Sequence, residues 1–229
     1  MSDIESRLAR VRERIATAAR RFGRPPEDVH LLAVSKRQPV AAIAAAVRAG
    51  QTAFGENYLQ EALEKVDALA GSGIQWHFIG ALQSNKTKAA AEYFDWIHTI
   101  DRLKIARRLS DQRPAERGPL NCCLQVNVSG EGSKSGVAPE EVPALAKAIS
   151  KLDNLRLRGL MAIPAPAPDF DAQRMPLRRL RELMTSLKAQ GLEMDTLSMG
   201  MSADLEAAVA EGATILRIGT AVFGERPGG

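Results

Sequence analysis

Residues 30–55, HLLAVSKRQPVAAIAAAVRAGQTAFG, hold an apolar run, a helical segment and a second apolar run in close succession. The first run, residues 30–35, ends at Lys36, and the second covers residues 53–55. Between them, Pro39 opens an alanine-rich segment that Gly50 closes, which is the expected start and stop of a helix. A strand, a helix and a strand in this order predict a parallel pair, because parallel neighbours need a crossover connection.

The same alternation continues along the rest of the chain. Further strands are expected at residues 76–79, 96–100, 121–128, 155–163, 196–199 and 215–218, with helical patterns that begin near Tyr58, Asn85, Arg102, Pro139, Asp171 and Ala203. Eight strands alternating with helices in 229 residues predict a closed (β/α)8 TIM barrel, as one domain over residues 1–229. An open doubly wound sheet is the alternative, but the GxGxxG fingerprint is absent after the first strand.

An extra helix is expected ahead of the first strand. Ile4, Leu8, Val11 and Ile15 recur at steps of three and four residues, which places them on one helical stripe. Few residues follow the last strand, so no eighth helix is expected there. The N-terminal helix is expected to cover that position instead.

The composition is that of a soluble globular chain, with 45% hydrophobic and 25% charged residues. The longest apolar run, residues 40–47, is too short to cross a bilayer, and no signal or transit peptide is visible. The two cysteines are adjacent, at Cys122 and Cys123, which fits a reducing cytoplasm and offers no CxxC spacing. The net charge of +4 favours anionic partners, but 4% aromatic residues are few for a nucleic-acid stacking surface. We therefore expect a cytoplasmic protein, a monomer, that binds neither membrane nor nucleic acid.

Polar residues gather where the expected strands end, and in a barrel these ends form the functional face. Lys36 is the first of them, and its amine is expected to point into the mouth of the barrel. There it can form a Schiff base with a carbonyl compound, bind a phosphate as a point charge, or remain an ordinary surface lysine. The sequence pattern alone leaves these three readings open.

The loops after the last two strands predict a phosphate site. Gly200 and Gly219 allow the backbone to approach an anion, and Ser202 stands in the N-cap position of a helix expected at residues 203–211. Barrels often bind phosphate with these two loops. The alternative is ordinary capping and turn chemistry with no ligand.

Other patterns are weaker. The glycine- and serine-rich loop at residues 130–136, which contains Lys134, does not fit the P-loop spacing. His30, His77 and His98 lie on three different strands without metal-ligand spacing, so we interpret them as core or rim histidines and expect no metal site. No Ser-His-Asp signature is visible.

Seven ordered blocks of this sequence, which span most of the chain, resemble the pyridoxal phosphate homeostasis protein family. The blocks are Val34-Ser35-Lys36; Phe54-Gly55-Glu56-Asn57-Tyr58 with Gln60-Glu61; His77-Phe78-Ile79-Gly80 with Leu82-Gln83 and Asn85-Lys86; Ser133-Lys134-Ser135-Gly136; Gly159-Leu160-Met161-Ala162-Ile163-Pro164; Leu197-Ser198-Met199-Gly200-Met201-Ser202 with Asp204; and Arg217-Ile218-Gly219-Thr220 with Phe223-Gly224. The family in turn resembles the barrel domain of alanine racemase.

The resemblance implies that pyridoxal 5′-phosphate (PLP) is the cofactor and that Lys36 forms a Schiff base with it. It implies that Ser202, Gly219 and Thr220 hold the phosphate, and that Arg217 faces the pyridine nitrogen. Met161 would pack near one face of the ring, and Asn57 is also expected to bind the cofactor. An arginine at that nitrogen leaves it unprotonated, which makes the ring a weak electron sink.

Three functions are compatible with these expectations. The first is a carrier or buffer that holds PLP, serves vitamin B6 homeostasis, passes PLP to apo PLP-dependent enzymes and has no robust catalysis. The second is a PLP-dependent racemase or decarboxylase-like enzyme. The third is a lysine-dependent aldolase acting on a sugar phosphate. The first is favoured, because racemase-type relatives add a β domain and a tyrosine from the partner subunit, whereas this chain has only Tyr58 and Tyr93 and no evident second acid or base.

Overall fold

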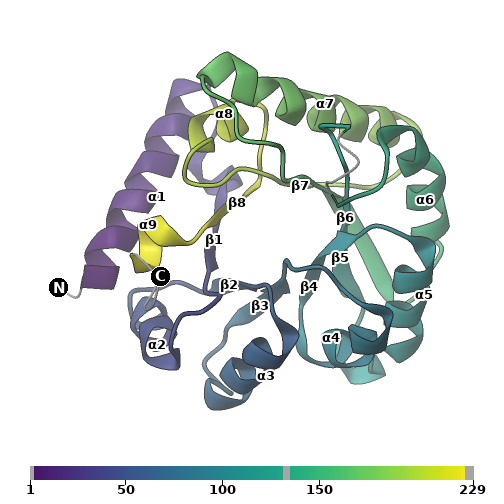
Figure 1. The fold of residues 1–229 in the computed structure, drawn as a ribbon, viewed down its shortest axis with the longest axis horizontal. Coiled ribbons are helices and arrows are strands. Elements are labelled where there is room, and N and C mark those ends of the chain that lie inside the picture. Colours follow the sequence, from purple (N-terminus) through teal and green to yellow (C-terminus); the bar gives the residue numbers. More distant parts are fainter. Residues whose placement is uncertain (1–2, 131–134, 225–229) are drawn as a thin grey trace.

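The computed structural model describes residues 3–130 and 135–224, in which parallel strands close into a barrel surrounded by helices (Figure 1). The strands are β1 His30–Val34, β2 Ala53–Glu56, β3 Gln75–Phe78, β4 Trp96–Ile100, β5 Leu120–Gln125, β6 Leu155–Met161, β7 Thr196–Ser198 and β8 Ile215–Ile218. The helices are α1 Asp3–Arg21, α2 Val40–Arg48, α3 Leu59–Ala68, α4 Thr87–Tyr93, α5 Leu103–Gln112, α6 Val142–Ile149, α7 Phe170–Ala189, α8 Leu205–Ala210 and α9 Thr220–Phe223. Short 3-10 segments lie at Pro26–Asp28, Ser84–Lys86, Ala115–Arg117 and Pro139–Glu141.

The barrel closes because the first strand pairs with the last. The order is β1 to β8 in sequence, every neighbouring pair is parallel, and β1 also pairs with β8, with Ala33 opposite Ile218. A closed sheet has no edge strand, and each crossover carries a helix to the outside. The predicted (β/α)8 barrel is thus confirmed, and the alternative of an open sheet is excluded.

Two strands end two or more residues earlier than their apolar runs suggest. The run at residues 121–128 gives β5 only to Gln125, because Val126 forms an isolated bridge with Val137 from the following loop. The run at residues 155–163 gives β6 only to Met161, two residues before Ile163 and Pro164. Residues at the end of an apolar run can therefore leave the sheet and line the mouth of the barrel.

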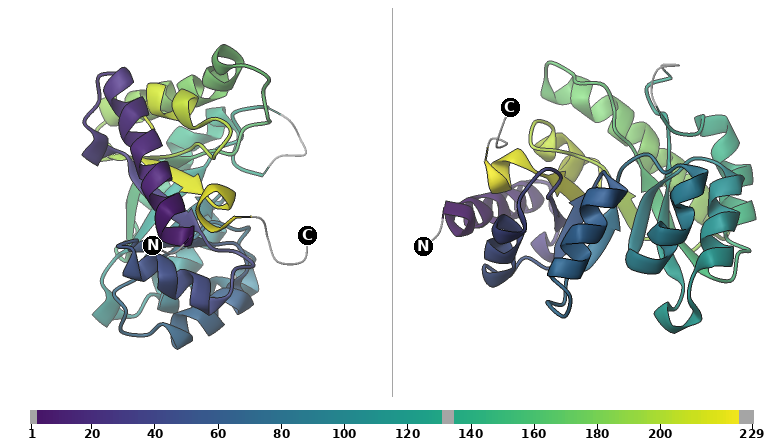
Figure 2. Two further views of the ribbon diagram at one scale, coloured as in Figure 1. Left: turned by 90° about the vertical axis from the view of Figure 1, so that its left-hand side faces the viewer. Right: turned by 60° about the horizontal axis from the view of Figure 1, so that its bottom comes forward.

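The end of the chain differs from expectation at one point. A single helical turn, α9, follows β8, so the expectation that no helix follows the last strand is wrong. The N-terminal helix α1 packs against α9 as well as against α8 and α2 (Figures 1 and 2). Its predicted stripe is confirmed, since Leu8, Val11 and Ile15 are buried and Ile4 packs against the same core.

The alternation of side chains along the strands separates two interiors. Between sheet and helices lies a large apolar core that contains Phe54, Phe78 and Phe94. Inside the barrel the packing is partly polar, because His77, His98 and other polar side chains are buried there beside small apolar clusters. No helix in the described part of the chain is long and apolar enough to span a membrane.

Candidate functional site

A pocket of about 320 Å³ opens at the carboxyl ends of the strands, the face on which barrel enzymes place their sites. It is lined by Val34, Lys36, Gln38, Asn57, Ile79, Ile163, Met201, Ser202, Ala203, Arg217, Gly219, Thr220 and Gly224. Six of the seven predicted site residues, Lys36, Asn57, Ser202, Arg217, Gly219 and Thr220, therefore lie around one pocket. Its volume is at the small end of ligand pockets, so it suits one small molecule.

Lys36 lies at the end of β1 and is partly buried. Among the described residues its amine has no hydrogen-bond or ion-pair partner, although the side chain lines the pocket. The backbone around it is fixed, since Ser35 N–H donates to Gly55 O at 3.0 Å and Gln38 N–H donates to Ser35 O at 3.0 Å. Lys36 thus offers an uncommitted primary amine on a well-defined turn.

A buried ionic cluster lies behind this turn. Lys65 of α3 donates from Nζ to Ser35 O and to Glu56 Oε1, each at 2.7 Å, and forms an ion pair with Glu61. The Ser35 hydroxyl donates to the same Glu56 oxygen at 2.6 Å, and Arg37 N–H donates to Glu61. Burial raises the pKa of Glu56, against the effect of its hydrogen bonds from Lys65 and Ser35. The cluster joins α3 and β2 to the residues on both sides of Lys36.

Arg217 lies at the inner end of the pocket. It is 5% exposed, its Nη1 donates to Ser198 Oγ and its Nη2 to Ala162 O, both at 2.8 Å. Burial lowers the pKa of Arg217 to about 10, so the guanidinium still carries its charge at neutral pH. The pocket therefore has two basic residues in its lining, Lys36 and Arg217.

The loop after β7 is anchored differently from the expectation. Helix α8 begins at Leu205 with Asp204 before it, and Asp204 Oδ1 accepts the Met201 N–H at 2.7 Å. Ser202 is therefore not the N-cap residue, and it is one of the residues that line the pocket. Arg14 of α1 supports the loop from outside, since it donates to Ser202 O at 2.9 Å and pairs with Glu206 at 2.7 Å.

Gly219, which lies between β8 and α9, approaches β1 closely. A Cβ at Gly219 would lie 3.2 Å from Val34 O, so a larger residue would crowd this end of the pocket. Thr220 follows at the start of α9 and lines the pocket. Two hydroxyl side chains, Ser202 and Thr220, thus border the pocket from the loops after β7 and β8.

Asn57 and Met161 have different surroundings. Asn57 Oδ1 is buried with no hydrogen-bond partner among the described residues, at a position that lines the pocket. Met161 is fully buried, packs with Trp96 and Cys123 inside the barrel, and is not a lining residue. Ile163 and Met201, which sequence reasoning did not select, supply the apolar lining on that side, about 40% exposed at the rim.

The other patterns considered from the sequence lie elsewhere. His77 and His98 are buried and hydrogen-bonded to each other, and His30 is exposed at the start of β1. The described residues contain no group of three or more potential metal ligands. Residues 131–134, with Lys134, fall outside the described ranges.

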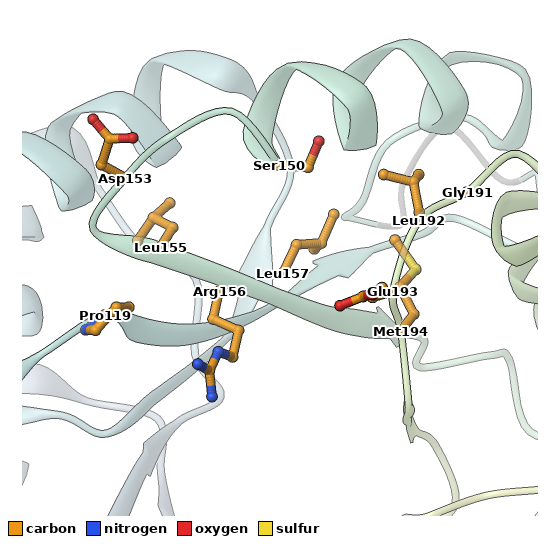
Figure 3. A pocket seen from close by; sticks show the side chains of 10 residues that line it. All are labelled: Pro119, Ser150, Asp153, Leu155, Arg156, Leu157, Gly191, Leu192, Glu193 and Met194. Carbon is orange, nitrogen blue, oxygen red and sulfur yellow. The ribbon is translucent and has the colours of Figure 1, made fainter.

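Two further hollows lie at the opposite end of the strands. One, of about 410 Å³, is bordered by the start of β6 and by residues 191–194 ahead of β7 (Figure 3). The other, of about 950 Å³, is lined among others by His30, Gln75 and Trp96. Neither contains a predicted site residue, so the chemistry expected from the sequence belongs to the pocket of Lys36.

Comparison with known proteins places this geometry in a family. Residues 6–227 match the family model described as alanine racemase, N-terminal domain. The chain is 61% identical to the pyridoxal phosphate homeostasis protein of Pseudomonas aeruginosa over 99% of this chain and 97% of that protein. It is 54% identical to the protein of the same name from Escherichia coli K12, over 99% and 98% of the two chains. The structure of PipY from Synechococcus elongatus with PLP bound matches with a TM-score of 0.85 and 38% identity, over 97% of this chain and all of that one.

Proposed function

This chain belongs to the family of the pyridoxal phosphate homeostasis proteins, built on the barrel of the alanine racemase N-terminal domain, and we propose that it holds PLP on Lys36 as an intracellular carrier or buffer. The observation that supports this most directly is the amine of Lys36, which has no partner among the described residues and borders a pocket for one small molecule. An amine without a polar partner in such a place is available to a carbonyl group.

The residues around the pocket fit PLP. When bound, PLP would supply an aldehyde to which the Lys36 amine could bond through C=N, with loss of water. Ser202, Gly219 and Thr220 can hold a phosphate through two hydroxyls and a close backbone approach. The buried Asn57 Oδ1, which has no partner among the described residues, can accept a hydrogen bond from a polar group of the ligand.

Arg217 is assigned to the pyridine nitrogen. It is the charged group other than Lys36 in the described lining, and its guanidinium donates but never accepts hydrogen bonds. A nitrogen that accepts from such a donor stays unprotonated. For Met161, which packs with Trp96 and Cys123 in the barrel interior, we propose only an indirect, supporting role.

The same lining favours a carrier over an enzyme. Racemisation needs two positioned acid or base groups, one on each face of the substrate. Among the described lining residues only Lys36 and Arg217 are titratable, and Arg217, with a pKa of about 10, keeps its charge at neutral pH and is a poor base. Tyr58 and Tyr93 are 50% and 44% exposed and lie outside the pocket lining. We therefore expect no robust turnover of amino acids.

The partners follow from the same reasoning. A ligand held through a reversible C=N bond in an open pocket can exchange with other amines, so we infer that apo PLP-dependent enzymes receive the PLP. We also propose that the protein acts as a monomer, built as one domain over residues 1–229. Cys122 and Cys123 are free thiols, as suits the cytoplasm.

The covalent link is tested by substitution of Lys36. We expect the wild-type protein to turn yellow with PLP and to gain a borohydride-stable label on Lys36, mapped by mass spectrometry. Lys36→Ala should lose both signals and keep its fold. Lys86→Ala, at an exposed lysine in the 3-10 segment before α4, is the matched control and should behave as wild type. A Lys36→Ala protein with the same stoichiometry of reducible label would show that another lysine forms the bond.

The carrier function is tested by transfer. The PLP-loaded protein is incubated with an apo PLP enzyme, whose recovered activity measures transfer, and separately with each L-amino acid, followed by chiral chromatography. We expect recovery of the apo-enzyme and no appreciable D-amino acid or decarboxylated product. Robust turnover that Lys36→Ala abolishes would replace the carrier with the racemase or decarboxylase-like enzyme.

A further inference from the structure

A chain of polar side chains crosses the interior of the barrel and ends at Arg217. Arg217 Nη1 lies 2.8 Å from Ser198 Oγ, and the same oxygen lies 2.7 Å from His98 Nδ1. His98 Nε2 lies 2.8 Å from His77 Nδ1, and His77 Nε2 lies 3.0 Å from Gln75 Oε1. The links come from β8, β7, β4 and β3, so the chain runs from the PLP pocket to the opposite mouth of the barrel.

The direction of this chain is set by the groups at its ends. A guanidinium only donates, so Ser198 Oγ accepts from Arg217 and can give its own proton to His98 Nδ1. His98 then donates from Nε2 to His77 Nδ1, and His77 donates from Nε2 to the side-chain amide oxygen of Gln75, Oε1. Every member is satisfied when both histidines are neutral and carry their proton on Nε2. Burial, which lowers the pKa of His77 to about 3 and that of His98 well below its ordinary value, agrees with this.

The hydrogen-bond chain matters because no carboxylate among the described residues bonds to the Arg217 guanidinium. In the described structure its hydrogen bonds go to a hydroxyl and to a backbone carbonyl, Ser198 Oγ and Ala162 O. Ala162 O is fixed by the backbone, whereas a serine hydroxyl rotates. The orientation of the guanidinium therefore depends on what holds the Ser198 hydroxyl, and that group is His98.

We propose that His98 is a positioning residue for the PLP pocket: it accepts the Ser198 proton, turns the Ser198 oxygen toward Arg217 and so aims the guanidinium at the ligand. His77 and Gln75 fix the protonated nitrogen of His98 and thereby keep its Nδ1 an acceptor. The consequence for the ligand rests on the proposed function, since Arg217 is assigned there to the pyridine nitrogen.

The first test uses the protein without any ligand. The chain has three histidines, and His30 is exposed, so the nitrogen NMR spectrum of histidine-labelled protein contains two buried rings to assign. We expect both His77 and His98 to be neutral with the proton on Nε2. A proton on Nδ1 of His98, or a protonated ring at neutral pH, would overturn the proposal whatever the protein binds.

The second test separates the two nitrogens of His98. Asn places an oxygen near the position of Nδ1 and can still accept from Ser198, whereas Gln places its amide near the position of Nε2, and Phe has neither. With PLP we expect His98→Asn to keep the wild-type absorption maximum and a Kd within about threefold. His98→Phe and His98→Gln should shift the maximum and raise Kd at least tenfold. His30→Phe is the matched control, because His30 is not part of the hydrogen-bond chain, and this variant should match wild type.

The outcomes distinguish this proposal from the proposed function. If the wild type does not bind PLP, the proposed function fails, and the NMR result alone decides the hydrogen-bond chain. If the wild type binds PLP and all three His98 variants match it in absorption and Kd, His98 positions nothing. Equal losses in folded Asn and Phe variants would also overturn the proposal, because a role through the Nδ1 acceptor is rescued by Asn. Should His98→Phe fail to fold, Ser198→Ala replaces it, with the same expected shift.

Discussion

Ser202 does not cap helix α8, so its hydroxyl is free for the proposed contact with the phosphate. The pattern predicted an N-cap, yet Asp204 stands before α8 and its carboxylate accepts the Met201 N–H. The Ser202 side chain is left at the pocket lining, while Arg14 and the Ser202 carbonyl hold the loop. A hydrogen bond to a charged group contributes about 1.5–3 kcal/mol. We therefore predict that Ser202→Ala weakens PLP binding by roughly tenfold or more, with the Kd measured by absorbance titration.

The ligand without its phosphate provides the control for this variant. Pyridoxal has the same aldehyde and ring, so Ser202→Ala should change its Kd by less than about twofold, and wild type should bind it much more weakly than PLP. If wild type binds pyridoxal and PLP equally, the loops after β7 and β8 hold no phosphate.

The ends of the predicted strands identified most of the polar residues that line the pocket, but not the apolar ones. Lys36, Arg217 and Gly219 could be selected because the ends of parallel strands converge on one face. Met161 could not be placed, because a residue at a strand end points either to the pocket or into the barrel, and this one packs on Trp96 and Cys123. Ile163 and Met201 escaped because apolar residues beyond a strand have no chemical signature.

Among the elements, the turn between β1 and α2 depends on a helix that does not follow it directly. Lys65 of α3 is 4% exposed and bonds to Ser35 O and to the buried carboxylate of Glu56. Removal of one partner from a buried ion pair leaves the other charge uncompensated, at a cost of about 3–5 kcal/mol. We predict that Lys65→Met lowers the free energy of unfolding by this amount, measured by urea denaturation, and weakens PLP binding because the turn at Lys36 loosens.

Two further variants make this prediction specific. Lys65→Met with Glu56→Gln should regain part of the stability, because the uncompensated carboxylate is gone. Lys88→Met removes a lysine that is 74% exposed and pairs with Glu92, so its effect should stay below about 1 kcal/mol. Equal effects of the Lys65 and Lys88 substitutions would show that the buried cluster does not support the turn.

The sequence could not show this cluster or the last helix. Lys65 reads as one charged position on an amphipathic helix, and its partners Ser35 and Glu56 lie 30 and 9 residues away. Helix α9 is a single turn of four residues, shorter than any periodic pattern can indicate. The longer helices are recognisable because their patterns repeat over many residues, and the eight strands in the described residues because short apolar runs alternate with those helices.

For the whole molecule, closure of the barrel was predictable and the contents of its interior were not. Regular alternation of strands and helices fixes parallel neighbours, and eight units in one small chain close. The hydrogen bonds inside join residues far apart in sequence, such as His98 and Ser198, 100 residues from each other. Each histidine alone resembles an ordinary buried side chain, and only the closed barrel brings them into one chain.

The neutral histidines make the stability of the barrel depend on pH. The unfolded chain protonates its histidines below about pH 6.5, whereas folded His77 keeps its neutral form down to about pH 3 and burial lowers the pKa of His98 as well. Between these pH values the unfolded state binds more protons, so their contribution is present above pH 6.5 and is lost as the pH falls. Each histidine accounts for about 1.4 kcal/mol per pH unit.

We predict that the free energy of unfolding, from urea denaturation, falls by about 2–3 kcal/mol between pH 7 and pH 5.5 through the two histidines together. The raised pKa of Glu56 acts in the opposite sense, and comparison with a variant removes that term. His98→Asn, which deletes one titrating ring and keeps the acceptor for Ser198, should therefore reduce the fall by about half of the histidine contribution. His30→Asn, at the exposed start of β1, is the control. A fall of the same size in His98→Asn and wild type would mean that protonation of His98 is not what destabilises the barrel in acid.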